Sequence, residues 1–249
     1  MKPLEQEIIK SRERVRNHGE VLTPKRVVKK MLDMPGLKEA CENLEATFFE
    51  PGVGEGAFLT EVLRRKLKMV SQQHGSSLIA YENHSLLALS TLYGVELLED
   101  NTKTCVVKMY ETYLEAYGRY MEKTGRKTKQ HVLDCATFII VRNIVQGDFL
   151  TQLSPSGQPI IFNEWKWINR GKGHKKVIIK RTEHTLRKIL SDARQSNKMS
   201  SSQMGSGEQL QFFTPLGTVM TEAIPIRYKK VKITDVYKEE VEIDESNSD

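Results

Sequence analysis

Apolar residues recur at helical spacing along most of the chain up to Asn143, with polar residues between them. The clearest example follows Gly56, where one apolar face is formed by Phe58, Leu59, Val62, Leu63 and Leu67. The same spacing, with turn residues at the ends, predicts further helices over residues 4–16, 24–34, 78–91, 99–122, 132–141 and 183–194. The tyrosines of the 99–122 helix are interpreted as core residues rather than as a surface that stacks on bases.

Short apolar runs separate these helices and predict strands over residues 44–50, 93–97, 144–146 and 159–162. Strands that alternate with helices are typical of an α/β fold, in which a parallel sheet carries helices on both faces. We expect one such core over residues 1–194.

The C-terminal part of the chain differs in composition from this core. Residues 195–208 are polar and rich in Ser, Gly and Met, which predicts a flexible linker. Apolar runs over residues 209–213 and 223–237 predict the final strands, or a small β-rich extension, within residues 209–238. Residues 239–249 hold six acids and no base, which predicts a disordered acidic tail.

The charge of the chain is uneven. The formal net charge is +6, and because the acidic tail lowers it, the rest of the chain is more basic than this value indicates. A basic body suits a polyanionic partner such as DNA. The alternative is that the excess of lysine and arginine serves solubility alone.

Several classes of protein are disfavoured by the sequence. No apolar run is long enough to cross a membrane, and the charged N-terminus lacks the apolar centre of a signal peptide. The cysteines, Cys41, Cys105 and Cys135, are scattered and have no histidine at ligand spacing, which indicates reduced thiols and no metal site. We therefore expect a cytoplasmic protein without a metal.

A glycine-rich turn after the first predicted strand carries the strongest chemical signal. It reads Glu50-Pro51-Gly52-Val53-Gly54-Glu55-Gly56, followed by the start of a helix. Such turns let a ligand approach backbone N–H groups closely. The carboxylates of Glu50 and Glu55 disfavour a bound phosphate. They favour a cationic ligand with an amine and hydroxyl groups, which points to S-adenosylmethionine. An ordinary glycine-rich strand-to-helix turn is the alternative.

Three other segments accompany this turn in a fixed order: Gly19-Glu20-Val21-Leu22-Thr23-Pro24 before it, then Leu92–Leu97 and Asn143–Leu150 after it. This ordered set resembles the S-adenosylmethionine-dependent DNA adenine-N6 methyltransferases that accompany restriction systems. The resemblance covers residues 17–167. It implies a Rossmann-like methyltransferase sheet with helices on both faces, S-adenosylmethionine as the cofactor and DNA as the substrate.

The resemblance also implies a set of cofactor-binding residues. Glu96, at the tip of the second strand, is where an acid accepts both ribose hydroxyls; the alternative is a solvated strand-end carboxylate. Asp148 matches the acid that accepts the exocyclic amine of adenine. Thr23 is also placed to cap the helix that Pro24 opens. The full set is Thr23, Pro24, Glu50, Pro51, Gly52, Gly54, Gly56, Phe58, Glu96 and Asp148.

The chain departs from the family at the catalytic segment. In place of Asn/Asp-Pro-Pro-aromatic it has Asn163-Glu164-Trp165-Lys166-Trp167. If the segment is catalytic, Asn163, Trp165 and Asp148 would hold the flipped base and polarise its amine. Without the prolines the carbonyl geometry is not fixed, so the segment is either a working variant or an inactive one. The alternative function is therefore an inactive methyltransferase-fold subunit that binds cofactor or DNA beside a second methyltransferase or restriction subunit. A third hypothesis is methylation of RNA or of protein glutamine.

A basic segment follows, with nine Lys or Arg residues and one acid between Lys166 and Lys188. Basic loops beside a base-flipping pocket neutralise phosphates. The DNA-binding residues expected here are Lys166, Arg170, Lys172, Lys175 and Lys176. A solvated loop is the alternative.

Overall fold

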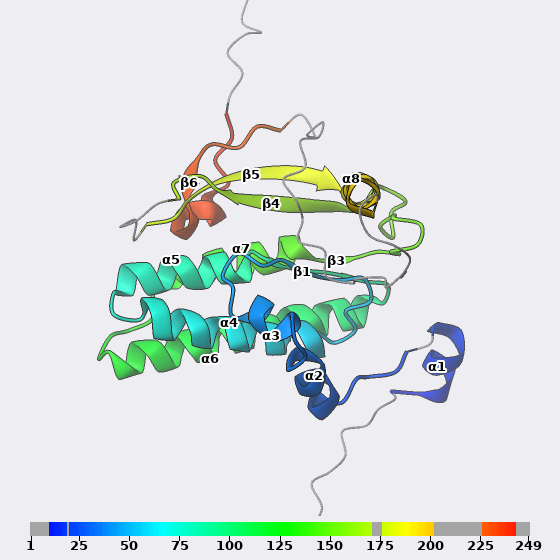
Figure 1. The fold of residues 1–249 in the computed structure, drawn as a ribbon, viewed down its shortest axis with the longest axis horizontal. Coiled ribbons are helices and arrows are strands. Elements are labelled where there is room, and N and C mark those ends of the chain that lie inside the picture. The colour runs from blue at the N-terminus through cyan, green and yellow to red at the C-terminus, as the bar shows by residue number, and fades with distance from the viewer. Residues whose placement is uncertain (1–9, 19, 171–175, 202–225, 243–249) are drawn as a thin grey trace, which may run out of the picture.

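The computed structural model describes residues 10–18, 20–170, 176–201 and 226–242 (Figure 1). The helices are α1 (Arg12–His18), α2 (Lys25–Leu32), α3 (Leu37–Cys41), α4 (Ala57–His74), α5 (Leu78–Leu89), α6 (Glu99–Lys123), α7 (Gln130–Asn143), α8 (Leu186–Ser201) and the 3-10 helix η1 (Ile233–Lys238). The strands are β1 (Phe48–Glu50), β2 (Leu92–Glu96), β3 (Ile144–Gln146), β4 (Ile161–Trp167), β5 (Ile178–Thr185) and β6 (Val231–Lys232).

Strands β1, β2 and β3 form a parallel sheet in that order. In its register Gly94 of β2 lies between Glu50 of β1 and Ile144 of β3. The chain is therefore a mixed α/β protein, as its pattern predicts. Three parallel strands do not confirm the doubly wound, Rossmann-like sheet that the resemblance implies.

One face of the parallel sheet is covered by helices and the other by a second sheet (Figure 1). Strands β4, β5 and β6 are antiparallel and pair in that order. Phe162 and Leu186 of this layer pack on Val95 of β2 in a buried apolar cluster. An antiparallel sheet with α8 thus stands where helices are expected on the second face.

The main core lies between the parallel sheet and helices α4 to α7. The apolar face predicted after Gly56 is buried, and it continues through Met69 and Val70, so that α4 reaches His74. Tyr113 and Tyr117 of α6 are buried in this cluster, which confirms the core interpretation of the tyrosines. No helix among the described residues is long and apolar enough to cross a membrane.

Asn143 joins the layers. It is the last residue of α7 and is almost completely buried. Its side-chain oxygen accepts a hydrogen bond of 2.9 Å from the Trp165 indole of β4. Its side-chain nitrogen donates to the carbonyl oxygens of Ser90 (3.3 Å), at the end of α5, and of Leu92 (3.1 Å), the first residue of β2. All the polar atoms of one buried amide are thereby used to connect three segments.

Two predicted strands have different bounds in the structure. The first strand begins at Phe48 rather than at Leu44, because the buried ammonium of Lys66 takes the carbonyls of Leu44 (3.2 Å) and Ala46 (2.7 Å) out of strand pairing. The strand predicted over 159–162 runs instead from 161 to 167 in β4. It extends because each of its residues pairs with one of β5.

The helix predicted from residue 183 begins at Leu186, since β5 runs to Thr185. The Thr185 hydroxyl accepts a hydrogen bond from the Lys188 N–H (3.3 Å), which favours a helix start there. Helix α8 continues to Ser201 and so covers the first part of the segment expected to be a linker. The described part of the 223–237 segment forms β6 and most of η1 rather than one long strand.

The remaining C-terminal predictions fall partly outside the described residues. Residues 202–225, which include the strand predicted over 209–213, and residues 243–249 of the acidic tail are not described. Within the tail, Glu239 forms ion pairs with Arg181 (2.6 Å) and Arg142 (2.9 Å).

Candidate cofactor site

Three acids predicted to bind the cofactor lie at or just past the C-terminal ends of adjacent parallel strands. Glu50 ends β1, Glu96 ends β2, and Asp148 follows β3. The Gly147 N–H donates to the Glu96 carbonyl oxygen (2.9 Å), which keeps the chain leading to Asp148 beside β2. Because parallel strands place these ends on one edge of the sheet, the structure brings the three acids to the same side, where α/β proteins bind ligands.

The glycine-rich turn closes against this edge. The Val53 N–H donates to the Val95 carbonyl (3.0 Å), and the Gly54 N–H donates to the Glu96 carboxylate (2.7 Å). Gly56 has a φ of +80°, and a Cβ there would lie 2.6 Å from the Cys105 sulfur. Glycine is therefore required at this position for both its conformation and its lack of a side chain.

Glu96 is fixed by backbone donors. One carboxylate oxygen accepts from Gly54, and the other accepts from the Leu98 N–H (3.0 Å) and from the Asn101 side chain (3.4 Å). A carboxylate held this way keeps a defined orientation.

Glu50 has a different environment. Its Oε2 atom is inaccessible to solvent and has no hydrogen-bond partner among the described residues. Burial, and then the neighbouring Glu96 carboxylate, raises the pKa of Glu50 to about 8. A buried carboxyl without a donor is costly unless a ligand supplies one. This edge of the sheet therefore fits a ligand group that donates hydrogen bonds or is cationic.

The N-terminal segment covers part of the same region through charged contacts. Arg14 of α1 pairs with Asp100 (2.9 Å) and with Glu20, and Lys10 pairs with Glu55 (2.8 Å). The hydrogen bond from Arg14, more than any other contact, holds the pKa of Asp100 at about 2.

Asn101 links this network to the candidate site, because its amide nitrogen also donates to Glu20 (2.8 Å). Sequence reasoning did not include Glu20 or Asn101 among the cofactor-site residues. Two sequence features could have indicated them. Glu20 is an acid shortly before Thr23-Pro24, and Asn101 belongs to the polar start of the 99–122 helix.

The other predicted cofactor residues have more ordinary surroundings. Phe58 is buried in the main core. Helix α2 begins at Lys25 with Pro24 as its N-cap and has no side-chain cap, so the predicted capping by Thr23 is wrong. Pro51 is half-buried and Gly52 is exposed at the turn.

The predicted catalytic segment lies in the middle of β4. Asn163 is 4% exposed; its side-chain oxygen accepts a hydrogen bond from Arg181, and its carbonyl oxygen accepts one from the Tyr93 hydroxyl (2.8 Å). Trp165 is buried and donates to Asn143. The polar atoms expected to receive the target amine are therefore engaged within the protein.

The predicted DNA-binding residues are only partly described, since Lys172 and Lys175 fall outside the described residues. Arg170 forms an ion pair of 2.5 Å with Glu45. Lys166 and Lys176 are exposed, and Lys166 lies opposite Lys180 in the β4–β5 ladder. The described part of this segment thus presents basic residues along the second sheet.

No group of His, Cys, Asp and Glu residues suited to a metal ion occurs in the described ranges. Comparisons of the chain with protein-family models, with curated proteins and with solved structures give no significant match. Its function is therefore inferred from its own residues and geometry.

Proposed function

We propose that this chain is a methyltransferase-type subunit that binds S-adenosylmethionine at the C-terminal edge of its parallel sheet and acts on DNA with a catalytic partner. One observation carries the proposal: the buried Oε2 atom of Glu50, which has no donor among the described residues, lies in a carboxyl group close enough to Glu96 for that carboxylate to raise its pKa. A ligand with an amine, a sulfonium and ribose hydroxyls matches these two acids.

The proposed roles follow the order of the strands. Glu50 receives the cationic methionine part, Glu96 accepts the ribose hydroxyls, and Asp148 accepts the adenine amine. The turn at Gly54 and Gly56 gives the cofactor access to the backbone. In this proposal the three parallel strands correspond to the cofactor-binding part of a Rossmann-like sheet.

We include a catalytic partner because the polar atoms of Asn163 are already engaged within this chain. A target amine has to reach the carbonyl and side-chain oxygens of Asn163, which is 4% exposed and holds these oxygens in hydrogen bonds from Tyr93 and Arg181. Freeing the Asn163 carbonyl would break its buried hydrogen bond with Tyr93, which connects the two sheets. A subunit that supplies cofactor binding while a partner supplies the catalytic segment avoids this cost.

The second candidate function is adenine-N6 methylation by this chain alone. It is favoured by the position of Asn163, whose carbonyl faces Tyr93 of β2, the strand that also carries Glu96. The bound sulfonium supplies an activated methyl group. The chain would hold the flipped base and polarise its amine through Asn163, once Tyr93 is displaced.

Calorimetric titration with S-adenosylmethionine tests the proposal. Glu96→Ala should weaken binding by at least about tenfold, because it removes the proposed ribose acceptor. Glu99→Ala is the matched control, since Glu99 is exposed and, among the residues that the structure describes, pairs only with Lys103 of its own helix. Absence of binding by the unaltered protein would refute both candidate functions.

A tritiated-methyl transfer assay on unmethylated DNA separates the two candidates. Cofactor binding without transfer supports the partner-dependent subunit. Transfer by the purified chain, lost in Asn163→Ala, supports the enzyme and rejects the need for a partner.

A further inference from the structure

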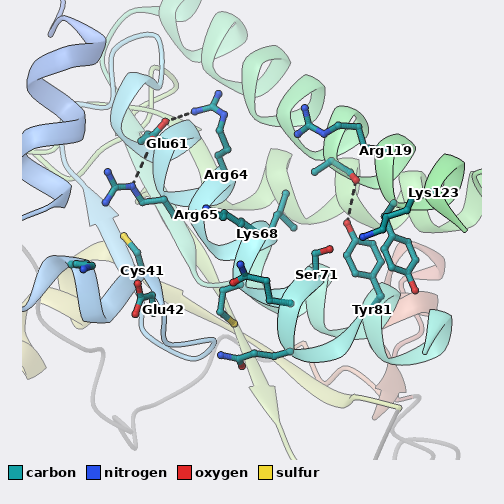
Figure 2. Close-up of a pocket in the computed structure, with 17 residues that line it drawn as sticks. Cys41, Glu42, Glu61, Arg64, Arg65, Lys68, Ser71, Tyr81, Arg119 and Lys123 are labelled. Atoms are coloured by element: carbon teal, nitrogen blue, oxygen red, sulfur yellow. Dashed lines mark hydrogen bonds and ion pairs between the residues drawn. The ribbon is translucent and has the colours of Figure 1, made fainter. Parts of the chain in front are cut away.

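We propose that the groove between helices α4 and α6 binds the phosphate backbone of nucleic acid. The groove has a volume of about 960 Å³ and lies on the helical side of the molecule (Figure 2). Residues of α3, α4, α5 and α6 line it. Neither the predicted basic segment nor the candidate cofactor site contributes to it.

The lining of the groove is strongly basic. It contains two acids, Glu42 and Glu61, against six basic side chains: Lys38, Arg64, Arg65, Lys68, Arg119 and Lys123. The basic groups stand on more than one wall, with Arg64 on α4 and both Arg119 and Lys123 on α6 (Figure 2). A groove with cations on both sides concentrates positive potential between its walls.

Half of these cations are available to a ligand. Arg64 and Arg65 pair with Glu61, and Arg119 pairs with Glu115. The other three have no ion pair within the described ranges and are exposed; they are Lys38, Lys68 and Lys123. Two further exposed basic residues, Arg126 and Lys127, follow the end of α6 in the chain.

The spacing of the cations favours a nucleic-acid strand. Arg64 and Lys68 are separated by four helical residues, and so are Arg119 and Lys123. Four residues correspond to about 6 Å along a helix. The charges of one DNA strand recur about every 3.4 Å along the duplex axis, so a row of cations at this helical spacing can follow the backbone. Two neutral hydrogen-bond donors of α4, Gln72 and Gln73, also line the groove and can contact phosphate oxygens.

The groove is distinct from the candidate cofactor site. Helix α4 starts at the glycine-rich turn, and Lys68 lies about 18 Å further along its axis than Gly56. The proposal does not require S-adenosylmethionine binding. It adds a surface that holds the nucleic-acid backbone independently of sequence.

Fluorescence anisotropy with a labelled short DNA duplex of arbitrary sequence tests the groove. The double variant Lys68→Gln/Lys123→Gln should weaken binding roughly tenfold and reduce the slope of log affinity against log salt by about two, since two phosphate contacts are lost. The matched control is Lys230→Gln/Lys232→Gln, which removes two exposed charges from the β6 region. Thermal unfolding should show both variants folded.

Three results would overturn the proposal: an unchanged salt slope in the groove variant, an equal loss in the control, or binding of inorganic tripolyphosphate but not of the duplex. Titration with S-adenosylmethionine keeps the two proposals apart. The groove variant should bind the cofactor as the unaltered chain does, whereas Glu96→Ala should leave the salt slope for the duplex unchanged.

Discussion

The hydroxyl of Tyr93, in the parallel sheet, donates a hydrogen bond of 2.8 Å to the backbone carbonyl oxygen of Asn163, in the antiparallel sheet. Burial raises the pKa of this hydroxyl far above its usual range, so it remains a donor at any ordinary pH. The bond fixes the second sheet over the first at the segment where the resemblance expects a catalytic site.

Tyr93→Phe should lower the free energy of unfolding by about 1–2 kcal/mol, because it leaves the Asn163 carbonyl without this donor while keeping the aromatic ring. Urea denaturation measures the change. Tyr110→Phe is the control, since Tyr110 is half-buried and its hydroxyl has no hydrogen bond in the described part of the chain. Equal effects of the two substitutions would contradict the role given to Tyr93.

Glu50 should make the protein less stable as the pH rises from 4.5 towards about 8. Burial, and then Glu96, raises its pKa in the folded state from 4.5 to about 8. Between these values the folded chain retains a proton that the unfolded chain has released, so stability falls with pH and levels off above about 8. The loss amounts to at most ~5 kcal/mol, at ~1.4 kcal/mol per pH unit.

Glu50→Gln tests this dependence, because the amide cannot ionise. Its stability relative to the unaltered protein should improve steadily between about pH 5 and pH 8 in urea denaturation. Exposed Glu111 of α6 is the control, since Glu111→Gln changes the same charge without a buried group. Parallel stability curves for Glu50→Gln and the unaltered chain would disprove the assignment.

Gly56→Ala should destabilise the protein by about 2 kcal/mol or more, because the position requires a positive φ and the added methyl group would collide with Cys105. Gly52→Ala, in the same turn, should change stability by less than about 0.5 kcal/mol, since nothing lies near its added Cβ. Thermal unfolding distinguishes them, and a tolerated Gly56→Ala would show that the turn is built differently.

Arg181→Lys should cost about 2 kcal/mol although it preserves the charge. The three nitrogens of the guanidinium donate hydrogen bonds to Asn163, Glu183 (2.6 Å) and Glu239 (2.6 Å). The single nitrogen of a lysine ammonium cannot reproduce this planar arrangement of donors. Its exposed neighbour on β5 provides the reverse control, with Lys180→Arg expected to be neutral in guanidinium denaturation. If Arg181→Lys were equally neutral, the buried network would not depend on fork geometry.

The helices and the glycine turn could be predicted because their signals are local. The apolar face after Gly56 has helical period and is buried throughout, and the acids of Glu50 and Glu96 end strands that are apolar runs in the sequence. Parallel pairing of β1 with β2 then places these acids on one edge, which is the arrangement expected for strands that alternate with helices.

The second sheet could not be predicted because its strands are stabilised by partners distant in sequence. The segment from Asn163 to Trp167 contains charged residues and follows the end of the strand predicted over 159–162, yet each of its residues pairs with β5. Glu183 resembles the first acid of a helix, but its register opposite Asn163 extends the strand. The basic groove was missed because residues from four separate helices line it, and only packing brings these helices together.

Asn143 bears on how the protein unfolds. Its buried amide bonds simultaneously to the end of α5, the start of β2 and the indole of Trp165. Without the second sheet, the buried side-chain oxygen of Asn143 would lose its hydrogen bond from Trp165. We therefore expect that neither layer can be removed or unfolded independently of the other. Shortening the chain before β4 should abolish cooperative unfolding altogether instead of yielding a smaller stable domain.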